Sequence, residues 1–330
     1  MRPRVGYLQM FATLVIVAAV SLIGNAQDGR GGGRGGGRGA EQGPPPPKDV
    51  VAPAIPGVVA AGTHIELVAY PVAGTEGPIR VLDGSGVLWT ERNVSHISKI
   101  DLNGNRSTFV ESAEGANGLG WDSKGRLLAV LRPSSGEKVA VLYPPASVAT
   151  LADKVDGKPF NALNDLIVST KDDIYFTDTQ GIYFLRPGGQ VKKVVDLKNM
   201  NGVVLSSDEK TLYANHKDGE YILAFDVQPD GSLKNQRQFV QLPVAGGDGM
   251  TVDAEGRLYV TAGAGVHVVS PEGKLLGTIP APYGLITVAF AGKDKKTMYG
   301  ISSLIDANRL QHAFVFTIPM QASGYKGRAK

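Results

Sequence analysis

The sequence contains no cysteine, and this absence excludes several kinds of chemistry at once. Without cysteine among the 330 residues there is no disulfide, no thiolate nucleophile and no lipid attachment through a processed N-terminal cysteine. Histidine is also scarce: the chain has five, and they do not cluster along the sequence. Zinc sites draw mainly on thiolate and imidazole ligands, so the composition argues against a zinc centre. Two tryptophans are too few to indicate a lectin.

The sequence also lacks a strong excess of charge of one sign. The formal charge of the whole chain is +3 at pH 7. Arg2 and Arg4 supply two of these charges and residues 27–61 supply one, so residues 62–330 are close to neutral. Such a balance does not favour a polyanionic partner, and we expect no nucleic acid partner. The Arg-Gly repeats at 30–39 lack the interleaved aromatic residues that RNA binding would use.

The first 26 residues have the features of an export signal. Arg2 and Arg4 give a positive start, residues 5–23 are predominantly apolar, and Gly24-Asn25-Ala26 precedes the expected cleavage point. Cleavage after Ala26 would leave an exported protein, periplasmic or extracellular. The apolar run is barely long enough to span a bilayer, so an uncleaved membrane anchor is the alternative. Residues 27–61, rich in Gly, Arg and Pro, are expected to form a disordered linker.

The rest of the chain repeats itself six times. The repeats open at Glu76, Asn117, Asn164, Asn201, Asp248 and Thr287, with spacings of 41, 47, 37, 47 and 39 residues. Each opening leads into an apolar run, a turn and a second apolar run. A period near forty built of short strands is typical of a β-propeller. In that fold each blade is a four-stranded antiparallel sheet whose first strand lines the central channel.

Apolar and polar residues alternate within the repeats, as expected for strands. Second strands are predicted at 87–90, 127–130, 173–177, 211–214 and 257–261, and later strands at 96–100, 139–142, 181–185, 221–225 and 266–269. The segment His64–Tyr70 is a strand left over before the first repeat. We expect it to close the ring against the last blade, which would remove exposed sheet edges. The sequence therefore predicts an all-β fold, a six-bladed β-propeller formed by residues 62–330.

The repeat openings place oxygen donors around one end of the predicted channel. Five of the six openings carry a carboxylate or an amide, namely Glu76, Asn117, Asn164, Asn201 and Asp248. These groups suit a hard cation such as Ca²⁺ or Mg²⁺ better than they suit a packed core. A single Asn-Gly or Asp-Gly pair is more simply explained as a turn before a strand. Their recurrence at equivalent repeat positions favours a site.

Several segments resemble the recurring motifs of the SMP-30/gluconolactonase/LRE-like family. The matching segments are Glu76-Gly77-Pro78, Ala116–Leu119, Gly157–Asp165, Asn201–Tyr213, Asp248–Asp253 and Ala289–Gly292. They occur in the family's order over roughly residues 62–320. The resemblance implies a six-bladed propeller with one divalent cation, often Ca²⁺, at the channel mouth. It also implies lactone hydrolysis, and related propellers hydrolyse organophosphate esters.

Carried over motif by motif, the resemblance assigns a role to each polar opening. Glu76, Asn164, Asn201 and Asp248 match the family's metal ligands, and Asp248 also matches its catalytic general base. Asn117 and Asn164 would face the same cavity, and we expect them to bind substrate. The expected cofactor is one divalent cation, Ca²⁺ first, with Mg²⁺, Mn²⁺ or Zn²⁺ as alternatives.

These features predict a secreted, divalent-metal-dependent hydrolase that opens a gluconolactone-type sugar lactone or a related cyclic ester. The metal would polarise the lactone carbonyl while Asp248 takes a proton from the attacking water. The expected partner is a small-molecule lactone or ester, the protein is expected to be a monomer, and a membrane is involved only if the N-terminal segment stays uncleaved. One alternative is a non-catalytic ligand- or protein-binding propeller, and another is a phosphotriesterase-like hydrolase that uses the same metal site.

Four positions depart from the family's pattern. They are Arg80, Glu91, Met200 and Gly247, where an aromatic residue, an Asp and two prolines are frequent. None of the four is a proposed ligand. We expect them to affect the shape of the pocket and therefore the choice of substrate.

Overall fold

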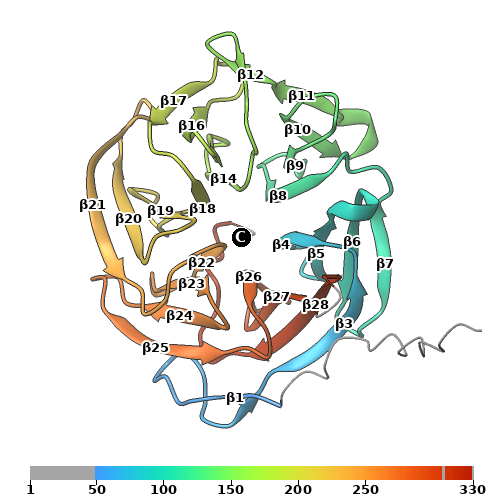
Figure 1. The fold of residues 1–330 in the computed structure, drawn as a ribbon, viewed down its shortest axis with the longest axis vertical. Helices are drawn as coiled ribbons and strands as arrows, with labels where there is room; N and C mark the ends of the chain where they lie inside the picture. Colours follow the sequence, from blue (N-terminus) through green and yellow to red (C-terminus); the bar gives the residue numbers. More distant parts are fainter. Residues whose placement is uncertain (1–48, 307–308, 329–330) are drawn as a thin grey trace, which may run out of the picture. The chain divides into compact units, whose positions relative to one another are not determined.

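The computed structural model describes residues 49–306 and 309–328. In this range six four-stranded antiparallel sheets form blades around a central channel, which confirms the predicted propeller (Figure 1). The expected signal peptide at 1–26 and most of the expected linker lie outside the described residues. In the described part of the chain, no helix has the length and apolar character that crossing a membrane requires.

Five of the blades are built from consecutive strands, with the innermost strand first in sequence. The first blade holds β4 (Thr75–Arg80), β5 (Gly86–Glu91), β6 (His96–Asp101) and β7 (Arg106–Val110). The second holds β8 (Ala116–Trp121), β9 (Leu127–Leu131), β10 (Lys138–Tyr143) and β11 (Ala149–Ala152). The third holds β14 (Leu166–Val168), β15 (Ile174–Asp178), β16 (Gly181–Leu185) and β17 (Lys192–Val195).

The fourth and fifth blades follow the same order. The fourth holds β18 (Met200–Leu205), β19 (Thr211–His216), β20 (Tyr221–Val227) and β21 (Leu233–Gln241). The fifth holds β22 (Met250–Val252), β23 (Leu258–Ala262), β24 (Gly265–Val269) and β25 (Leu275–Pro280). Burial depends on position in the blade. The inner and middle strands are buried on both faces, whereas the outermost strands, such as β7 and β21, are largely exposed.

The sixth blade joins the two ends of the propeller. It holds β26 (Leu285–Ala291), β27 (Thr297–Ile305) and β28 (Gln311–Pro319), with β3 (Glu66–Val72) as its outermost strand. Strand β3 pairs antiparallel with β28, where Val72 lies opposite Ala313. The predicted closing strand is therefore confirmed. The apolar faces of neighbouring blades pack together, and one such cluster combines residues of the third, fourth and fifth blades.

Residues 49–61 correct the expected linker boundary, because they are part of the folded unit. Strand β1 (Val51–Ala52) pairs with β2 (Thr63–His64), and Ile55 forms a bridge with Val59. The side chains of Ala52, Ile55, Val58 and Val59 are buried in the apolar cluster of the fifth and sixth blades. Small residues suggested a spacer, but this stretch supplies enough apolar side chains to cover the outside of those blades.

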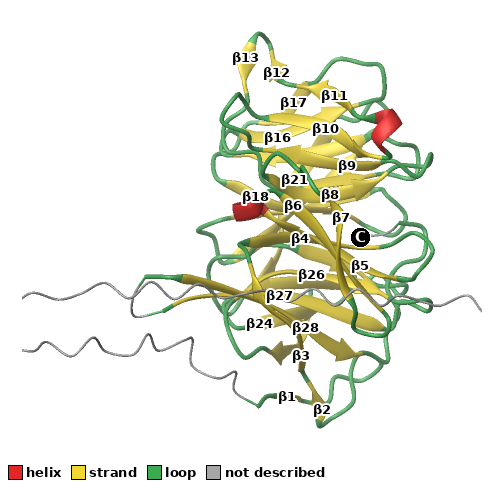
Figure 2. Cartoon of the chain, turned by 90° about the vertical axis from the view of Figure 1, so that its right-hand side faces the viewer, coloured by secondary structure: helices red, strands yellow, loops and turns green. Residues whose placement is uncertain are grey.

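Among residues 49–306 and 309–328 the helices are two single 3₁₀ turns, η1 (Arg92–Val94) and η2 (Pro145–Ser147). They are drawn red in Figure 2, where the ring is seen edge-on. A small hairpin of β12 (Lys154–Val155) and β13 (Lys158–Pro159) extends the connection between the second and third blades. These insertions lie in connections between strands and leave the blades regular.

The C-terminal segment lies across one end of the channel, near the middle of the ring in Figure 1. The buried Arg328 pairs with Glu209 at 2.8 Å and donates to the carbonyl oxygen of Leu205 at 2.6 Å. The ammonium group of Lys295 donates to the carbonyl oxygens of Tyr325 and Arg328. These partners belong to turns that follow innermost strands, so the segment covers the end of the channel at which those strands finish.

Candidate functional site

The predicted site residues all lie at the other end of the channel, where the innermost strands begin. Glu76, Asn117 and Asn201 are in the first two positions of β4, β8 and β18. Asn164 and Asp248 come two residues before β14 and β22. The innermost strands lead from this end to the other, so their first residues meet around one opening. The simpler turn interpretation is wrong for Asn117 and Asn201, which belong to strands.

The glycine after four of these residues explains how the innermost strands come close enough to share a site. A Cβ atom at any of these glycines would overlap the next blade. The nearest contacts would be Asn117 O at 2.4 Å from Gly77, Asp165 Oδ1 at 2.6 Å from Gly118, Asp248 O at 2.1 Å from Gly202 and Thr287 Oγ1 at 2.0 Å from Gly249. Glycine allows this approach because it has no side chain. The recurring polar-Gly pair is therefore a feature of channel packing.

Buried hydroxyl groups on the second strands connect the blades just behind the site. Thr90, Thr177 and Thr261 occupy equivalent places on β5, β15 and β23. Their Oγ1 atoms donate to carbonyl oxygens of the next blade, namely Asn117 O at 3.3 Å, Asn201 O at 2.6 Å and Ile286 O at 2.7 Å. Asn215 takes this place on β19, where its side chain donates to Asp248 O and accepts from the Gly202 N–H at 2.9 Å. The backbone that carries the site is thereby fixed from blade to blade.

Asn117 links two other parts of the site. Its Nδ2 atom donates to the carbonyl oxygen of Asn164 at 2.8 Å and lies 3.4 Å from Asn164 Oδ1. Its Oδ1 atom accepts a hydrogen bond from Nη1 of Arg92 at 3.3 Å. Asn117 is buried, so these partners fix the orientation of its amide. The side chain thus stands between a predicted metal ligand and a guanidinium group at the mouth of the channel.

Glu76 lies in an unusually negative environment. Burial raises the pKa of its carboxyl group well above the ordinary value, and the charges of Asp248 and Asp165 raise it further. Arg92 and Arg132 act in the opposite direction, towards the charged form. Glu76 and Asp248 therefore lie near enough for their charges to interact. Neighbouring carboxylates disfavour each other's ionisation unless a cation lies between them.

The donor set of the site fits a hard divalent cation. Oδ1 of Asn201 is buried and has no hydrogen-bond partner among the described residues. A buried carbonyl oxygen without a partner costs about 1–3 kcal/mol, and coordination of a cation would remove that cost. No three His, Asp or Glu side chains in the described ranges are grouped to hold a metal ion. A cation here would therefore depend on the two amides, Asn164 and Asn201, in addition to Glu76 and Asp248.

Two arginines and one aspartate of this region were missed by the sequence analysis. Arg92 opens η1 and Arg132 follows β9, so both stand in turns at the end of the channel that carries the site. The guanidinium group of Arg132 donates to the carbonyl oxygens of Leu163 and Ala162, the latter at 3.2 Å. Asp165 accepts from the backbone N–H of Val203 at 3.3 Å in the next blade. Sequence spacing gave no signal for the arginines, because both lie outside the repeat openings.

The four departures from the family's pattern have structural explanations. Arg80 ends β4, away from the site, and donates to the carbonyl oxygens of Gly292 and Leu82 at 3.0 and 2.7 Å. The buried Glu91 carboxylate accepts the N–H of Ala73 at 3.0 Å and also binds Ser98 and Arg106. Met200 is buried in the core. Only Gly247 touches a predicted ligand, through its carbonyl oxygen 3.5 Å from Nδ2 of Asn201.

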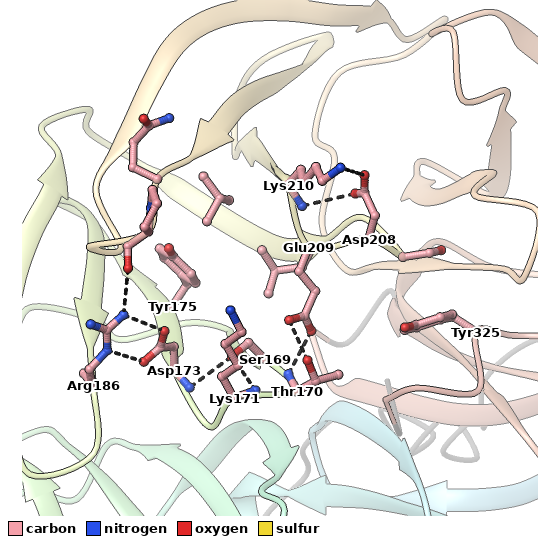
Figure 3. A pocket seen from close by; sticks show the side chains of 15 residues that line it. Ser169, Thr170, Lys171, Asp173, Tyr175, Arg186, Asp208, Glu209, Lys210 and Tyr325 are labelled. Atoms are coloured by element: carbon pink, nitrogen blue, oxygen red, sulfur yellow. Dashed lines mark hydrogen bonds and ion pairs between the residues drawn. The ribbon is translucent and has the colours of Figure 1, made fainter.

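A second cleft, shown in Figure 3, has a volume of about 570 Å³ and lies between the third and fourth blades. Its walls are the turns that follow β14 and β18, so it opens at the opposite end of the propeller. Some of its charged side chains pair with each other, as Arg186 does with Asp173 at 2.8 Å. Glu209 accepts from Thr170 and also pairs with Arg328. This cleft contributes none of the predicted site residues.

Comparison with known proteins agrees with this arrangement. The sequence profile of the SMP-30/Gluconolactonase/LRE-like region matches residues 74–304. Over 271 residues the chain is 25% identical to a gluconolactonase of Zymomonas mobilis subsp. mobilis, with 69% of this chain and 75% of that protein covered. A solved gluconolactonase from Xanthomonas campestris has a similar fold, with a TM-score of 0.71, 23% identity, and coverage of 83% of this chain and 94% of that chain.

The fold is also similar to that of a calcium-binding regucalcin from Agrobacterium tumefaciens strain C58. The TM-score is 0.65 at 17% identity, and 78% of this chain and 94% of that chain are covered. The profile match takes in the innermost strands of all six blades and every predicted metal ligand. The chain therefore belongs to the SMP-30/gluconolactonase/LRE-like family.

Proposed function

We propose that the protein is a divalent-metal-dependent hydrolase that opens a lactone, of the gluconolactone type or a related cyclic ester. The observation that carries this proposal is the buried, unpartnered Oδ1 of Asn201 at the end of the channel where Glu76 and Asp248 also lie. The Zymomonas and Xanthomonas proteins, which are described as gluconolactonases, support the reaction class. The Agrobacterium protein, described as calcium-binding, supports Ca²⁺ as the cation.

Glu76, Asn164, Asn201 and Asp248 would hold the cation, which would supply a Lewis acid for the lactone carbonyl. Asp248 accepts a proton from the water that attacks the carbonyl carbon. The bond between that carbon and the ring oxygen then breaks, the ring oxygen receives a proton, and the product is a hydroxy acid. Asn117 and Asn164 orient the substrate at the same opening.

The negative environment of Glu76 favours this proposal over a non-catalytic binding propeller. A carboxylate that is half-buried beside two others destabilises the metal-free fold. Such a placement does not stabilise the fold. Carboxyl groups whose pKa is shifted in this way concentrate at functional sites.

The test combines metal content, acid release from a panel of lactones, and the substitution Asp248→Asn. An amide keeps one oxygen for the cation but accepts no proton at neutral pH, so turnover should fall by about 10²- to 10⁴-fold in the metal-loaded variant. Asp196→Asn is the control, because this exposed aspartate pairs with Lys193 on an outer strand. Turnover near wild type in metal-loaded Asp248→Asn would remove Asp248 as the base. A metal-loaded wild type that opens no lactone or ester would favour the binding propeller.

A further inference from the structure

A cleft of about 630 Å³ adjoins the candidate site at the end where the innermost strands begin. It lies over the first and second blades. Its lining includes Arg92, Glu114 and Arg132. Arg92 also donates to Asn117, which in turn donates to Asn164, so hydrogen bonds connect the lining of the cleft to the predicted substrate-binding residues.

Two guanidinium groups face this one cleft. Arg132 is half-buried, and burial followed by the positive charge of Arg92 lowers its pKa. Two cations that line one cleft repel each other, and an anion bound between them stabilises the arrangement. The lining therefore has a charge pattern that a neutral ligand does not require.

The hydrogen bonds that hold the two arginines end on uncharged oxygen atoms. Arg92 donates to the amide oxygen of Asn117 and Arg132 to the carbonyl oxygens of Leu163 and Ala162. The acidic residue of the lining, Glu114, pairs with Lys138 at 2.7 Å. Each guanidinium has five N–H donors, so donors remain available on both.

The carboxylates of Glu76 and Asp248 would balance the charge of the bound cation and not that of the two arginines. Glu76 and Asp248 together carry two negative charges, which equal the charge of the divalent cation that they would hold. Glu137 offsets part of the charge of Arg132, and the remaining positive charge of Arg92 and Arg132 is available to the substrate. A planar guanidinium fork matches the oxygens of a carboxylate or a phosphate, and such charge-assisted pairs are among the strongest hydrogen bonds in proteins.

We propose that the preferred substrate carries an anionic group, a carboxylate or a phosphate, in addition to its lactone ring, and that Arg92 and Arg132 bind this group. The inference rests on the proposed function, because it names the substrate class of the same site. Arg92 and Arg132 select the substrate, whereas Asp248 acts on the reacting atoms.

The experiment compares three six-carbon lactones on the metal-loaded enzyme: neutral glucono-δ-lactone, D-glucaro-1,4-lactone with a free carboxylate, and 6-phospho-glucono-δ-lactone. At least one anionic lactone should exceed the neutral lactone in kcat/KM by about tenfold or more. The better of the two identifies carboxylate or phosphate as the recognised group. The preference should shrink with added salt, because the cleft is open to solvent.

Arg92→Gln is the main variant, because Arg92 is exposed and its loss should leave the fold intact. It should reduce the ratio of anionic to neutral kcat/KM by about tenfold. Arg132→Lys keeps the charge but loses the fork, and it should reduce the ratio less than Arg132→Gln does. Arg237→Gln removes a positive charge from the outer strand β21, where Arg237 pairs with Asp226, and should not change the ratio.

A wild type that opens the neutral lactone at least as well, with a ratio unchanged in Arg92→Gln, would overturn the inference and leave the proposed function standing. Calorimetric binding of D-glucarate and of the neutral polyol D-glucitol tests the anion site when no lactone is opened. Tighter binding of D-glucarate that is lost in Arg92→Gln would support the anion site although hydrolysis fails. Equal binding of D-glucarate and D-glucitol, unchanged in Arg92→Gln, would overturn the anion site.

Discussion

The substitution Gly202→Ala tests whether the close approach of innermost strands creates the site. A Cβ atom at Gly202 would lie 2.1 Å from the carbonyl oxygen of Asp248 and 3.0 Å from its carbon. Ordinary contact begins near 3.4 Å, so the oxygen is about 1.3 Å too close. The obstacle is backbone, already bound by Asn215, and no side-chain rotation removes it. The fourth and fifth blades must therefore move apart.

This overlap sets the size of two effects, a loss of stability and a loss of calcium affinity. Overpacking of this kind costs about 1–3 kcal/mol, and for domains of 150–250 residues each kcal/mol lowers Tm by about 2–4 °C. A separation of roughly 1 Å between Asn201 and Asp248 is large against the 2.3–2.6 Å range of calcium–oxygen distances. We expect calcium affinity to fall about tenfold or more, as it does when the support of a ligand is removed.

Thermal unfolding in chelator and a calcium titration measure the two effects separately. Gly284→Ala is the matched control, because its Cβ would meet nothing nearer than 3.7 Å at the same end of the propeller. The control should leave Tm and the calcium midpoint near wild type. If Gly202→Ala matched Gly284→Ala in both measurements, close strand approach would not be what assembles the site.

Three further substitutions probe the charge, the donor set and the links between blades. In chelator, Glu76→Gln should stabilise the protein at neutral pH. The pKa of Glu76 in the folded state is raised above its ordinary 4.5, so stability present below pH 4.5 is lost as the pH rises through the folded-state pKa. In a pH series of denaturant unfolding, the loss should reach up to about 1.4 kcal/mol per pH unit. A wild-type profile with no such loss, or one that Gln does not flatten, would contradict this. Asn201→Leu should leave the Tm in chelator unchanged or higher but abolish the stabilisation by calcium. In a competent site that stabilisation is about 2.7 kcal/mol at a calcium concentration of 100 times Kd. Full stabilisation of the variant by calcium would exclude Asn201 as a ligand. Thr177→Val leaves the carbonyl oxygen of Asn201 unpaired and should cost about 1–3 kcal/mol in denaturant unfolding, whereas Thr150→Val on an exposed strand should cost less than about 0.5 kcal/mol.

The propeller and the location of the polar residues could be predicted from sequence because both depend on repetition. The spacing from Glu76 to Thr287 fixed which residues are equivalent, and equivalence in a closed ring places them at one end of the channel. The closing strand followed from the same reasoning, since His64–Tyr70 had no partner in its own repeat. Period two within each repeat then located the second and third strands.

Features that depend on contacts between blades could not be predicted in this way. Arg92 and Arg132 enter the cleft from turns whose sequences do not repeat, and their positions depend on how the neighbouring backbone curves. The hydroxyl groups of Thr90 and Thr177 resemble ordinary strand residues until the next blade is placed beside them. The linker prediction fails for residues 49–61 because their apolar side chains pack against blades that are distant in sequence.

The pairing of β3 with β28 has a consequence for how the chain reaches its native state. Val72 and Ala313 are partners although 241 positions separate them, so β3 has no partner strand until β28 and thus almost the whole chain has been made. Contacts within the other blades are local and form early, whereas ring closure must wait for a long-range encounter. Until then both ends of the incomplete ring present open sheet edges, which are prone to aggregate. Maturation of the protein is therefore expected to be post-translational, with closure as its slow and vulnerable step.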